Sequence, residues 1–269
     1  MTDLPAPHTP ESIRLDGRVV VVTGAANGIG RATALLAAGF GADLAVCDRD
    51  AEGLAGVADE VRALGRQVHD DVLDVRDDDA VARFAEGVGD RFDRVHGVVN
   101  NAGGTFHAPF MESSAKGDQA LIAENFTSVV GVTRAFVPLM AGRSASVVNV
   151  TSSEAFQAAP GFSVYAAMKA GVESLTRTLA LELAADGVRV NSVSPDGIPT
   201  SGDAALAAEV QATSEFLPPP VPPIGHHAPP EDCASVIVFL LGDLARFVTG
   251  TAVHVAGGLH AAGGWHRRT

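Results

Sequence analysis

The feature that most constrains the fold is a run of four valines that passes directly into a glycine-rich turn and a helix. Val19 to Val22 form the continuous β-branched stretch expected of a strand buried on both faces of a parallel sheet. Thr23 to Gly30 follow at once, and an Ala/Leu-rich segment then predicts a helix to about Phe40. In this context glycines let the backbone approach a pyrophosphate, and the helix N-terminus supplies N–H groups. An ordinary tight turn shares the local pattern, so the turn alone leaves both interpretations open.

The same alternation of strand and helix continues along the chain. Further strands are expected at 43–47, 67–73, 95–99, 147–150, 188–193 and 251–255, and helices at 50–64, 77–91, 114–140, 165–185 and 231–241. Repeated units of this length predict an α/β fold, a single Rossmann-type doubly wound parallel sheet with helices on both faces. Ligands of such sheets bind beyond the carboxyl ends of the strands, which is where the motifs described below fall.

The chain reads as one domain with three irregular segments. Residues 1–14 are Pro-rich and polar and predict a flexible N-terminal arm, followed by a single domain at 15–269. Residues 196–230 contain a Pro-rich run and emerge from the ligand-binding end of the sheet, which favours a substrate lid, with a short helix at 206–215. Residues 257–269 form a Gly-rich tail containing the single Trp, which we expect to add to a subunit contact. The sequence shows no internal repeat and no second domain.

The second strand ends at an acidic residue that bears on the choice of cofactor. Asp48 lies 18 residues past Gly30, and a carboxylate there accepts both ribose hydroxyls of an adenosine and repels a 2′-phosphate. Arg49 follows directly and would suit a 2′-phosphate. The strand end therefore favours NAD, with NADP as the less favoured alternative.

A tyrosine and a lysine four residues apart predict proton-transfer chemistry. Tyr165 and Lys169 fall on one face of an expected helix, and the chain has only one Tyr and two Lys. A positive charge beside a phenol lowers a Tyr pKa that is ordinarily about 10, and so produces a general acid or base. A Ser at the end of the preceding strand would donate to the same reacting oxygen. The alternative is a chance pairing of a half-buried ring with a solvated amine.

These motifs together resemble the classical short-chain dehydrogenase/reductase family over roughly residues 15–258. The resemblance rests on Thr23-Gly24-x3-Gly28-Ile29-Gly30, Asn100-Asn101-Ala102-Gly103, Ser152 and Tyr165-x3-Lys169, in the family's order. It implies an NAD(P)-dependent oxidoreductase acting on an alcohol or a carbonyl. It also implies a homotetramer built through the long helices near 114–140 and 165–185.

The resemblance also assigns the remaining catalytic residues. Ser152 precedes Tyr165 by 13 residues, the family's common interval, whereas Ser153 would require a one-residue deletion and is left as a substrate-side or structural hydroxyl. Asn125 matches the family's helix Asn, which holds a water that links the active-site Lys to solvent. The catalytic set is therefore Asn125, Ser152, Tyr165 and Lys169.

The expected cofactor site combines the glycine turn, the strand ends and the positions that the resemblance implies. Its members are Gly24, Asn27, Gly28, Ile29, Gly30, Asp48, Arg49, Asp74, Val75, Asn101, Ala102, Gly103, Tyr165, Lys169, Pro195, Ile198 and Thr200. Three positions depart from the family pattern. Asp196 replaces the Gly that follows Pro195, Ala256 replaces the Asp before the closing glycines, and Ala155 stands where Gly is common. Because Glu154 comes just before Ala155, we expect a carboxylate to face the substrate.

Composition narrows the partners and the compartment. A net charge of −13 repels nucleic acid and anionic lipid surfaces. Cys47 and Cys233 lie in apolar contexts and predict buried free thiols in a reducing compartment, and no disulfide or metal site is expected. No signal peptide and no apolar run of about 18 residues is apparent. A soluble cytoplasmic protein is the expectation.

The sequence thus predicts reversible hydride transfer between NAD(H) and a secondary alcohol or ketone, with Tyr165 as general acid/base. One alternative is an NADP-dependent 3-oxoacyl-thioester-type ketoreductase, which Asp48 and Asn27 disfavour, since NADP-preferring relatives often place a basic residue at position 27. A second is a non-catalytic NAD(H)-binding sensor. The substrate is expected to be small and largely apolar, in a pocket formed by Gly104, Thr105, Phe106, Glu154, Phe156, Phe162 and residues 198–224.

Overall fold

Seven parallel strands form one sheet in the computed structural model, which describes residues 6–140, 144–200, 203–216 and 221–263. The strands are β1 (Val19–Thr23), β2 (Asp43–Asp48), β3 (Val68–Val72), β4 (Gly97–Asn100), β5 (Ala145–Val150), β6 (Val188–Pro195) and β7 (Ala252–Val255). Their order is β3-β2-β1-β4-β5-β6-β7, and every registered pair is parallel. The strand order reverses between β1 and β4, which creates the crevice where ligands of such sheets bind. The predicted doubly wound fold is confirmed.

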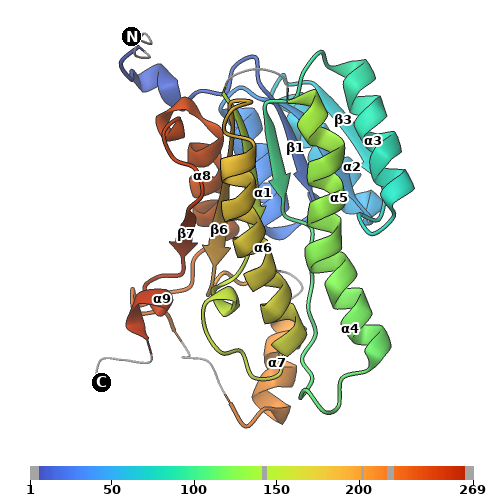
Figure 1. The fold of residues 1–269 in the computed structure, drawn as a ribbon, viewed down its shortest axis with the longest axis vertical. Helices are drawn as coiled ribbons and strands as arrows, with labels where there is room; N and C mark the ends of the chain where they lie inside the picture. Colours follow the sequence, from blue (N-terminus) through green and yellow to red (C-terminus); the bar gives the residue numbers. More distant parts are fainter. Residues whose placement is uncertain (1–5, 141–143, 201–202, 217–220, 264–269) are drawn as a thin grey trace.

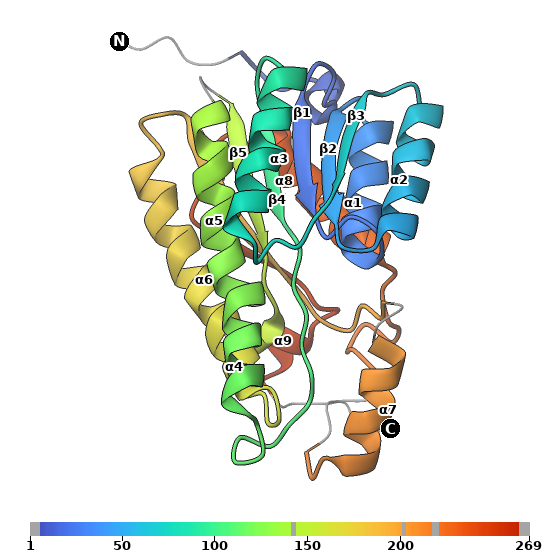
Figure 2. The same ribbon diagram turned by 90° about the vertical axis from the view of Figure 1, so that its right-hand side faces the viewer.

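Helices cover both faces of the sheet (Figures 1 and 2). One face packs against α1 (Gly28–Gly39), α2 (Ala51–Ala63) and α8 (Pro230–Leu241). The other packs against α3 (Asp78–Arg91), α5 (Ser128–Phe136) and α6 (Ser163–Glu182). Both faces of the sheet are therefore buried at its centre, which explains why β1 is an apolar run without alternation.

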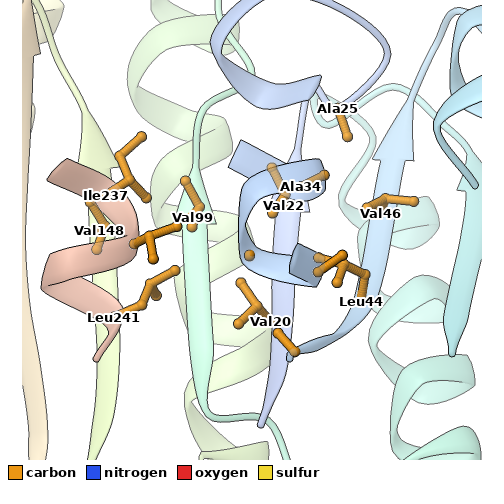
Figure 3. Packing of buried hydrophobic residues seen from close by; sticks show 14 of the residues in the cluster. Val20, Val22, Ala25, Ala34, Leu44, Val46, Val99, Val148, Ile237 and Leu241 are labelled. Atoms are coloured by element: carbon orange, nitrogen blue, oxygen red, sulfur yellow. The ribbon is translucent and has the colours of Figure 1, made fainter. Parts of the chain in front are cut away.

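Alternate residues of each strand enter opposite halves of the core. Val20 and Val22 lie in the cluster with α1 and α8, whereas Val19 and Val21 lie in the cluster with α3 and α5. Figure 3 shows the first of these clusters, in which Leu241 lies near Val20. Gly97 on β4 makes room for this packing, because a Cβ there would lie 2.6 Å from Leu241 Cδ2.

The helix expected at 114–140 is interrupted. It consists of α4 (Ala115–Ile122), a π-helical turn (Ala123–Thr127), α5 and a final 3-10 turn (Val137–Leu139). Figures 1 and 2 show it as one long rod beside α6. By length and composition alone, residues 115–139 qualify as a membrane-spanning helix, which the sequence analysis did not anticipate. Core helices of soluble proteins meet the same criterion, so the finding alone assigns no membrane.

Short elements complete the chain: η1 (Pro10–Ile13), η4 (Ser153–Ala155), α7 (Asp203–Thr213), η5 (Asp243–Ala245) and α9 (Leu259–Ala262). The N-terminal segment contacts the body, since Arg246 Nη1 donates to Ala6 O at 2.6 Å. In Figure 1, α7 and α9 lie beyond the carboxyl ends of the strands. Parts of three predicted segments lie outside the described residues: 1–5 of the arm, 201–202 and 217–220 of the lid, and 264–269 of the tail, with its Trp265.

Candidate active site

The turn between β1 and α1 has a shape that only glycine allows. Gly24 and Gly28 have φ angles of +66° and +53°, in the left-handed region. A Cβ on Gly30 would lie 2.0 Å from Gly24 O and 2.5 Å from Asn101 Nδ2. The missing side chains therefore let the turn fold tightly against the N-terminus of α1, where Asn27 is the N-cap residue and the first N–H groups of the helix, such as that of Ile29, have no partner within the helix. This cradle fits the pyrophosphate of a dinucleotide.

The asparagine after β4 holds this turn to the neighbouring strand. Asn101 Nδ2 donates to both Thr23 O and Gly24 O at 3.0 Å. The backbone N–H groups of Asn101 and Ala102 each donate to Thr23 Oγ1 at 3.1 Å. Thr23 is thus a positioning residue that the site predictions left out, although its place in the Thr-Gly motif was visible in the sequence.

The carboxylate of Asp48 lies beside the glycine turn at the end of β2. Its Oδ2 accepts from Ala26 N at 3.0 Å, and its Oδ1 accepts from Asp50 N at 3.0 Å. Arg49 has a 67% exposed side chain, and its Nη1 lies 3.9 Å from Glu124 Oε1. The negative charge at the strand end is therefore fixed in position, whereas the guanidinium beside it engages a carboxylate from another element.

Lys169 is the buried cation of the site. Its side chain lies on α6 with only 4% of the residue exposed, and its Nζ donates to Val150 O at 3.0 Å. Nζ also lies 5.6 Å from the centroid of the Tyr165 ring. Burial lowers the pKa of Lys169 from 10.5 to about 8, against the opposing influence of Glu124 and Glu154. The helix thus places an ammonium beside the only tyrosine.

Asn125 lies in the π-helical turn and faces the same space. Its Nδ2 donates to Gly104 O at 2.8 Å and to Leu121 O at 3.0 Å. Its Oδ1 is buried and accepts no hydrogen bond from the described part of the chain. A Cβ on Gly103 would lie 2.9 Å from Asn125 Oδ1 and 3.3 Å from Lys169 Nζ. An unpaired acceptor close to an ammonium suits the water that the family resemblance implies.

Ser152 lies at the end of β5 as the N-cap of η4 and is buried. Its hydroxyl donates to the Glu154 carboxylate. The next hydroxyl, Ser153 Oγ, donates to Asp196 Oδ2 at 2.5 Å. Burial and the Asp196 charge raise the pKa of Glu154. The structure therefore brings two carboxylates to the catalytic end of β5, one on each serine.

Comparison with known proteins identifies the family to which this site belongs. The family model described as enoyl-(acyl carrier protein) reductase matches residues 24–260. This chain belongs to the short-chain dehydrogenase/reductase family. The chain resembles curated relatives along nearly their whole length. It is 38% identical over 248 residues to a 3-oxoacyl-(acyl-carrier-protein) reductase of Thermotoga maritima, covering 92% of this chain and 99% of the relative.

Other relatives of this chain are named for substrates that contain a cyclohexane ring. It is 39% identical over 246 residues to the cis-4-hydroxycyclohexanecarboxylate dehydrogenase of Sinomonas cyclohexanicum, covering 91% of this chain and 97% of the relative. It is 34% identical over 277 aligned positions to the cyclohexanol dehydrogenase of a Rhodococcus species, covering 93% and 98%.

Two solved dehydrogenase structures also superpose on this chain over most of its length. Carveol dehydrogenase of Mycobacterium avium in complex with NAD superposes with a TM-score of 0.85 at 29% identity, covering 91% of this chain and 98% of that one. A 7α-hydroxysteroid dehydrogenase complexed with NADH and a 7-oxo bile acid superposes with a TM-score of 0.85 at 28% identity, covering 94% and 98%.

Further residues predicted to bind the cofactor lie at the end of β6 and beyond it. Ile198 is buried, and Thr200 lies against the glycine turn, since a Cβ on Gly28 would be 3.0 Å from Thr200 Cγ2. Pro195 ends β6, and the next residue, Asp196, donates its N–H to Val255 O at 3.1 Å.

Asp74 and Val75, the two cofactor residues predicted after β3, belong to a segment that is held beside β2. Leu73 N donates to Asp48 O at 3.0 Å, which keeps this segment at the carboxyl edge of the sheet. Val75 is buried, and the carboxylate of Asp74 pairs with Arg76, which lowers the pKa of Asp74. Both residues therefore lie near the carboxyl edge of the sheet, with the Asp74 carboxylate engaged by Arg76.

Aromatic residues surround the substrate side. Phe106 and Phe162 line a shallow hollow with Leu121. His107, which the sequence analysis missed, is buried against the Phe162 ring at a centroid distance of 5.4 Å, and its Nδ1 lies 3.5 Å from Thr213 Oγ1 on α7. The predicted lid therefore meets the body at this histidine. No local pattern marked it, because its partners are distant in sequence.

Phe156 belongs to a separate cluster near the C-terminal segment. Its ring lies edge-on to His254 and His260, at centroid distances of 4.7 and 5.5 Å, and the two imidazoles stack 3.5 Å apart. Phe156 is 40% exposed, so part of its side chain remains accessible to solvent. The cluster anchors α9 next to the loop that follows Ser152.

Proposed function

We propose that the protein interconverts a secondary alcohol and a ketone with NAD(H), and that Tyr165 is the general acid/base. The observation that carries this proposal is the buried Lys169 ammonium 5.6 Å from the Tyr165 ring centroid. A cation at this distance in a low-dielectric site favours the phenolate, which takes the hydroxyl proton in oxidation and returns it in reduction. The nicotinamide, when bound, accepts or supplies the hydride.

The other catalytic residues have supporting roles in this proposal. Ser152 donates a hydrogen bond to the reacting oxygen as negative charge develops there. Lys169 lowers the pKa of Tyr165 and holds the nicotinamide ribose. Asn125 keeps a water in contact with Lys169, for which its unpaired Oδ1 is suited.

We propose NAD over NADP on the strength of Asp48. Its carboxylate is fixed by two backbone N–H groups beside the phosphate cradle, so a 2′-phosphate would meet a negative charge there. The carveol dehydrogenase that superposes on this chain is a complex with NAD, which supports the choice. The test is a fluorescence titration with NADH and with NADPH. Tighter NADH binding is expected, and tighter NADPH binding would mean that Arg49 governs the site.

We propose a cyclic, largely apolar secondary alcohol as the substrate. Two relatives of high coverage are named for hydroxycyclohexane substrates, and aromatic residues line the hollow beside Tyr165's helix. A 3-oxoacyl thioester is the second candidate, favoured by the 38% identity to the acyl-carrier-protein reductase. Initial rates with cyclohexanol and NAD, compared with an acetoacetyl thioester and NADPH, distinguish them. A faster thioester reduction would select the second candidate.

We further propose a cytoplasmic homotetramer. Leu181 on α6 and Phe247 after α8 are 82% and 101% exposed, and apolar side chains so placed suit subunit contacts. Light scattering on the purified protein tests the assembly, and a monomeric mass would contradict it.

A further inference from the structure

Glu154 occupies an unusual position for an active site that must donate a hydrogen bond to its substrate. The hydroxyl of Ser152 donates to the Glu154 carboxylate, and Glu154 N approaches Ser152 Oγ at 3.5 Å. A serine hydroxyl carries a single hydrogen. While Ser152 gives that hydrogen to Glu154, it has none for the reacting oxygen.

A substrate that brings its own donor resolves this conflict. A hydroxyl next to the reacting oxygen would donate to Glu154 in place of Ser152, and Ser152 would then donate to the reacting oxygen. The reacting oxygen beside Ser152 and the new donor beside Glu154 would be neighbours, because Ser152 and Glu154 are in direct hydrogen-bond contact. The oxygens of a vicinal diol lie roughly one hydrogen-bond length apart, about 2.8 Å. The donor therefore belongs on the carbon next to the reacting carbinol.

The surroundings of Glu154 also act against anionic substrates. Asp196 lies close enough to raise the pKa of Glu154, and it is itself held by Ser153. Lys169 opposes this effect but already donates to Val150 O. A carboxylate on the substrate at this position would add a third negative charge to a partly buried site.

We propose that Glu154 is a specificity-determining residue that selects substrates with a hydroxyl on the carbon next to the reacting carbinol and disfavours substrates with a carboxylate there. The inference rests on the proposed function. Oxidation of a vicinal diol would give the α-hydroxyketone, with the hydride passed to NAD and the proton to Tyr165. The substrate class is thus narrowed from cyclic alcohols to cyclic vicinal diols and their α-hydroxyketones.

The test compares three probes with saturating NAD: cyclohexanol, cis-1,2-cyclohexanediol and 2-hydroxycyclohexanecarboxylate. In the wild type, kcat/KM should be at least about tenfold higher for the diol than for cyclohexanol, since a hydrogen bond to a charged group is stronger than one between neutral groups. In Glu154→Gln this ratio should fall about tenfold, and the ratio of carboxylate to cyclohexanol should rise about tenfold. Equal ratios in wild type and variant would overturn the inference.

The control variant is Glu124→Gln. Glu124 also acts on the Lys169 pKa, but it contacts neither Ser152 nor Glu154 in any hydrogen bond or ion pair found among the described residues. Glu124→Gln should change kcat/KM for all three probes by the same factor and leave their ratios unchanged. If Glu154 served only to stabilise the first turn of η4 through Ser152, Glu154→Gln would also leave the ratios unchanged, which would overturn the inference.

The outcomes separate the inference from the function on which it rests. A wild-type enzyme that oxidises cyclohexanol without preferring the diol overturns the inference alone. A wild-type enzyme that oxidises no secondary alcohol overturns the proposed function and the inference with it. Because the wild type suffices for the comparison of 1,2- with 1,4-cyclohexanediol, the test holds even if Glu154→Gln folds poorly. Equal kcat/KM for these two diols would also overturn it.

Discussion

Replacing Lys169 with Met should stabilise the protein while abolishing its activity. The ammonium is almost fully buried, and its pKa falls from 10.5 to about 8 in the folded state. At about 1.4 kcal/mol per pH unit, this shift corresponds to about 3 kcal/mol of destabilisation at pH 7. The variant loses the hydrogen bond to Val150 O, worth about 1 kcal/mol. Lys169→Met should therefore be more stable than the wild type by about 2 kcal/mol at pH 7.

The difference in stability between the two proteins depends on pH, because Lys169 loses its proton at a lower pH in the folded state than in the unfolded state. Below pH 8 Lys169 is charged in both states, so the folded wild type bears the full cost of burial. Between pH 8 and 10.5 the Lys169 side chain is neutral in the folded state and still protonated in the unfolded state. The free energy of unfolding of the wild type therefore rises with pH in this range. The advantage of Lys169→Met should accordingly shrink to near zero by about pH 9.5.

Urea denaturation of the protein without cofactor, at the two pH values, measures both effects. Lys116→Met is the matched control, because Lys116 is the only other lysine and is exposed on α4. Its difference from wild type should stay within about 0.5 kcal/mol at either pH. A Lys169→Met variant that is less stable than wild type at pH 7, or whose advantage in stability does not change with pH, would contradict the assigned cost of burying the ammonium.

Three further predictions concern the cofactor site and the thiols. Asp48→Ala should weaken NADH binding at least about tenfold in a fluorescence titration and leave NADPH binding unchanged or tighter; an equal loss for both cofactors would contradict the role given to Asp48. Gly30→Ala should lower the free energy of unfolding by about 1–3 kcal/mol and prevent NADH binding, because its Cβ meets Gly24 O at 2.0 Å. Gly39→Ala, in the same helix, meets no atom within 4 Å and should fold and bind normally, so equal melting temperatures and equal NADH affinities for the two variants would count against the cradle. Burial raises the pKa of both thiols, that of Cys233 to about 12, so neither Cys47 nor Cys233 should react with a thiol reagent before denaturant is added.

The strands of the sheet could be predicted because buried parallel strands are continuous apolar runs. Val19–Val22 is such a run, Val147–Val150 is one interrupted only by the buried Asn149, and both lie within strands of the sheet. The ends of elements were less predictable. The strand expected from Val95 begins at Gly97, because Val95 N donates instead to Leu139 O. Such a bond depends on a helix end more than 40 residues away, and no local pattern reports it.

In the candidate site, too, some contacts could be predicted from local spacing and others could not. Local spacing was enough to place Tyr165 beside Lys169, since both lie on one helix. The π-helical turn at Asn125 was not predictable, because the side chain bonds to Gly104 O in a distant loop. Glu154 was expected to face the substrate, but its bond to Ser152 depends on the 3-10 turn that follows β5.

We propose that Tyr165 transfers the proton in an NAD-dependent oxidation of a secondary alcohol. The most direct test follows the absorbance of reduced nicotinamide when wild type and Tyr165→Phe are given NAD and cyclohexanol or 1,2-cyclohexanediol, with NADH affinity measured on both proteins. Wild type should reduce NAD, and Tyr165→Phe should be slower by at least about 100-fold while binding NADH with similar affinity. Equal rates in the two proteins would contradict the claim.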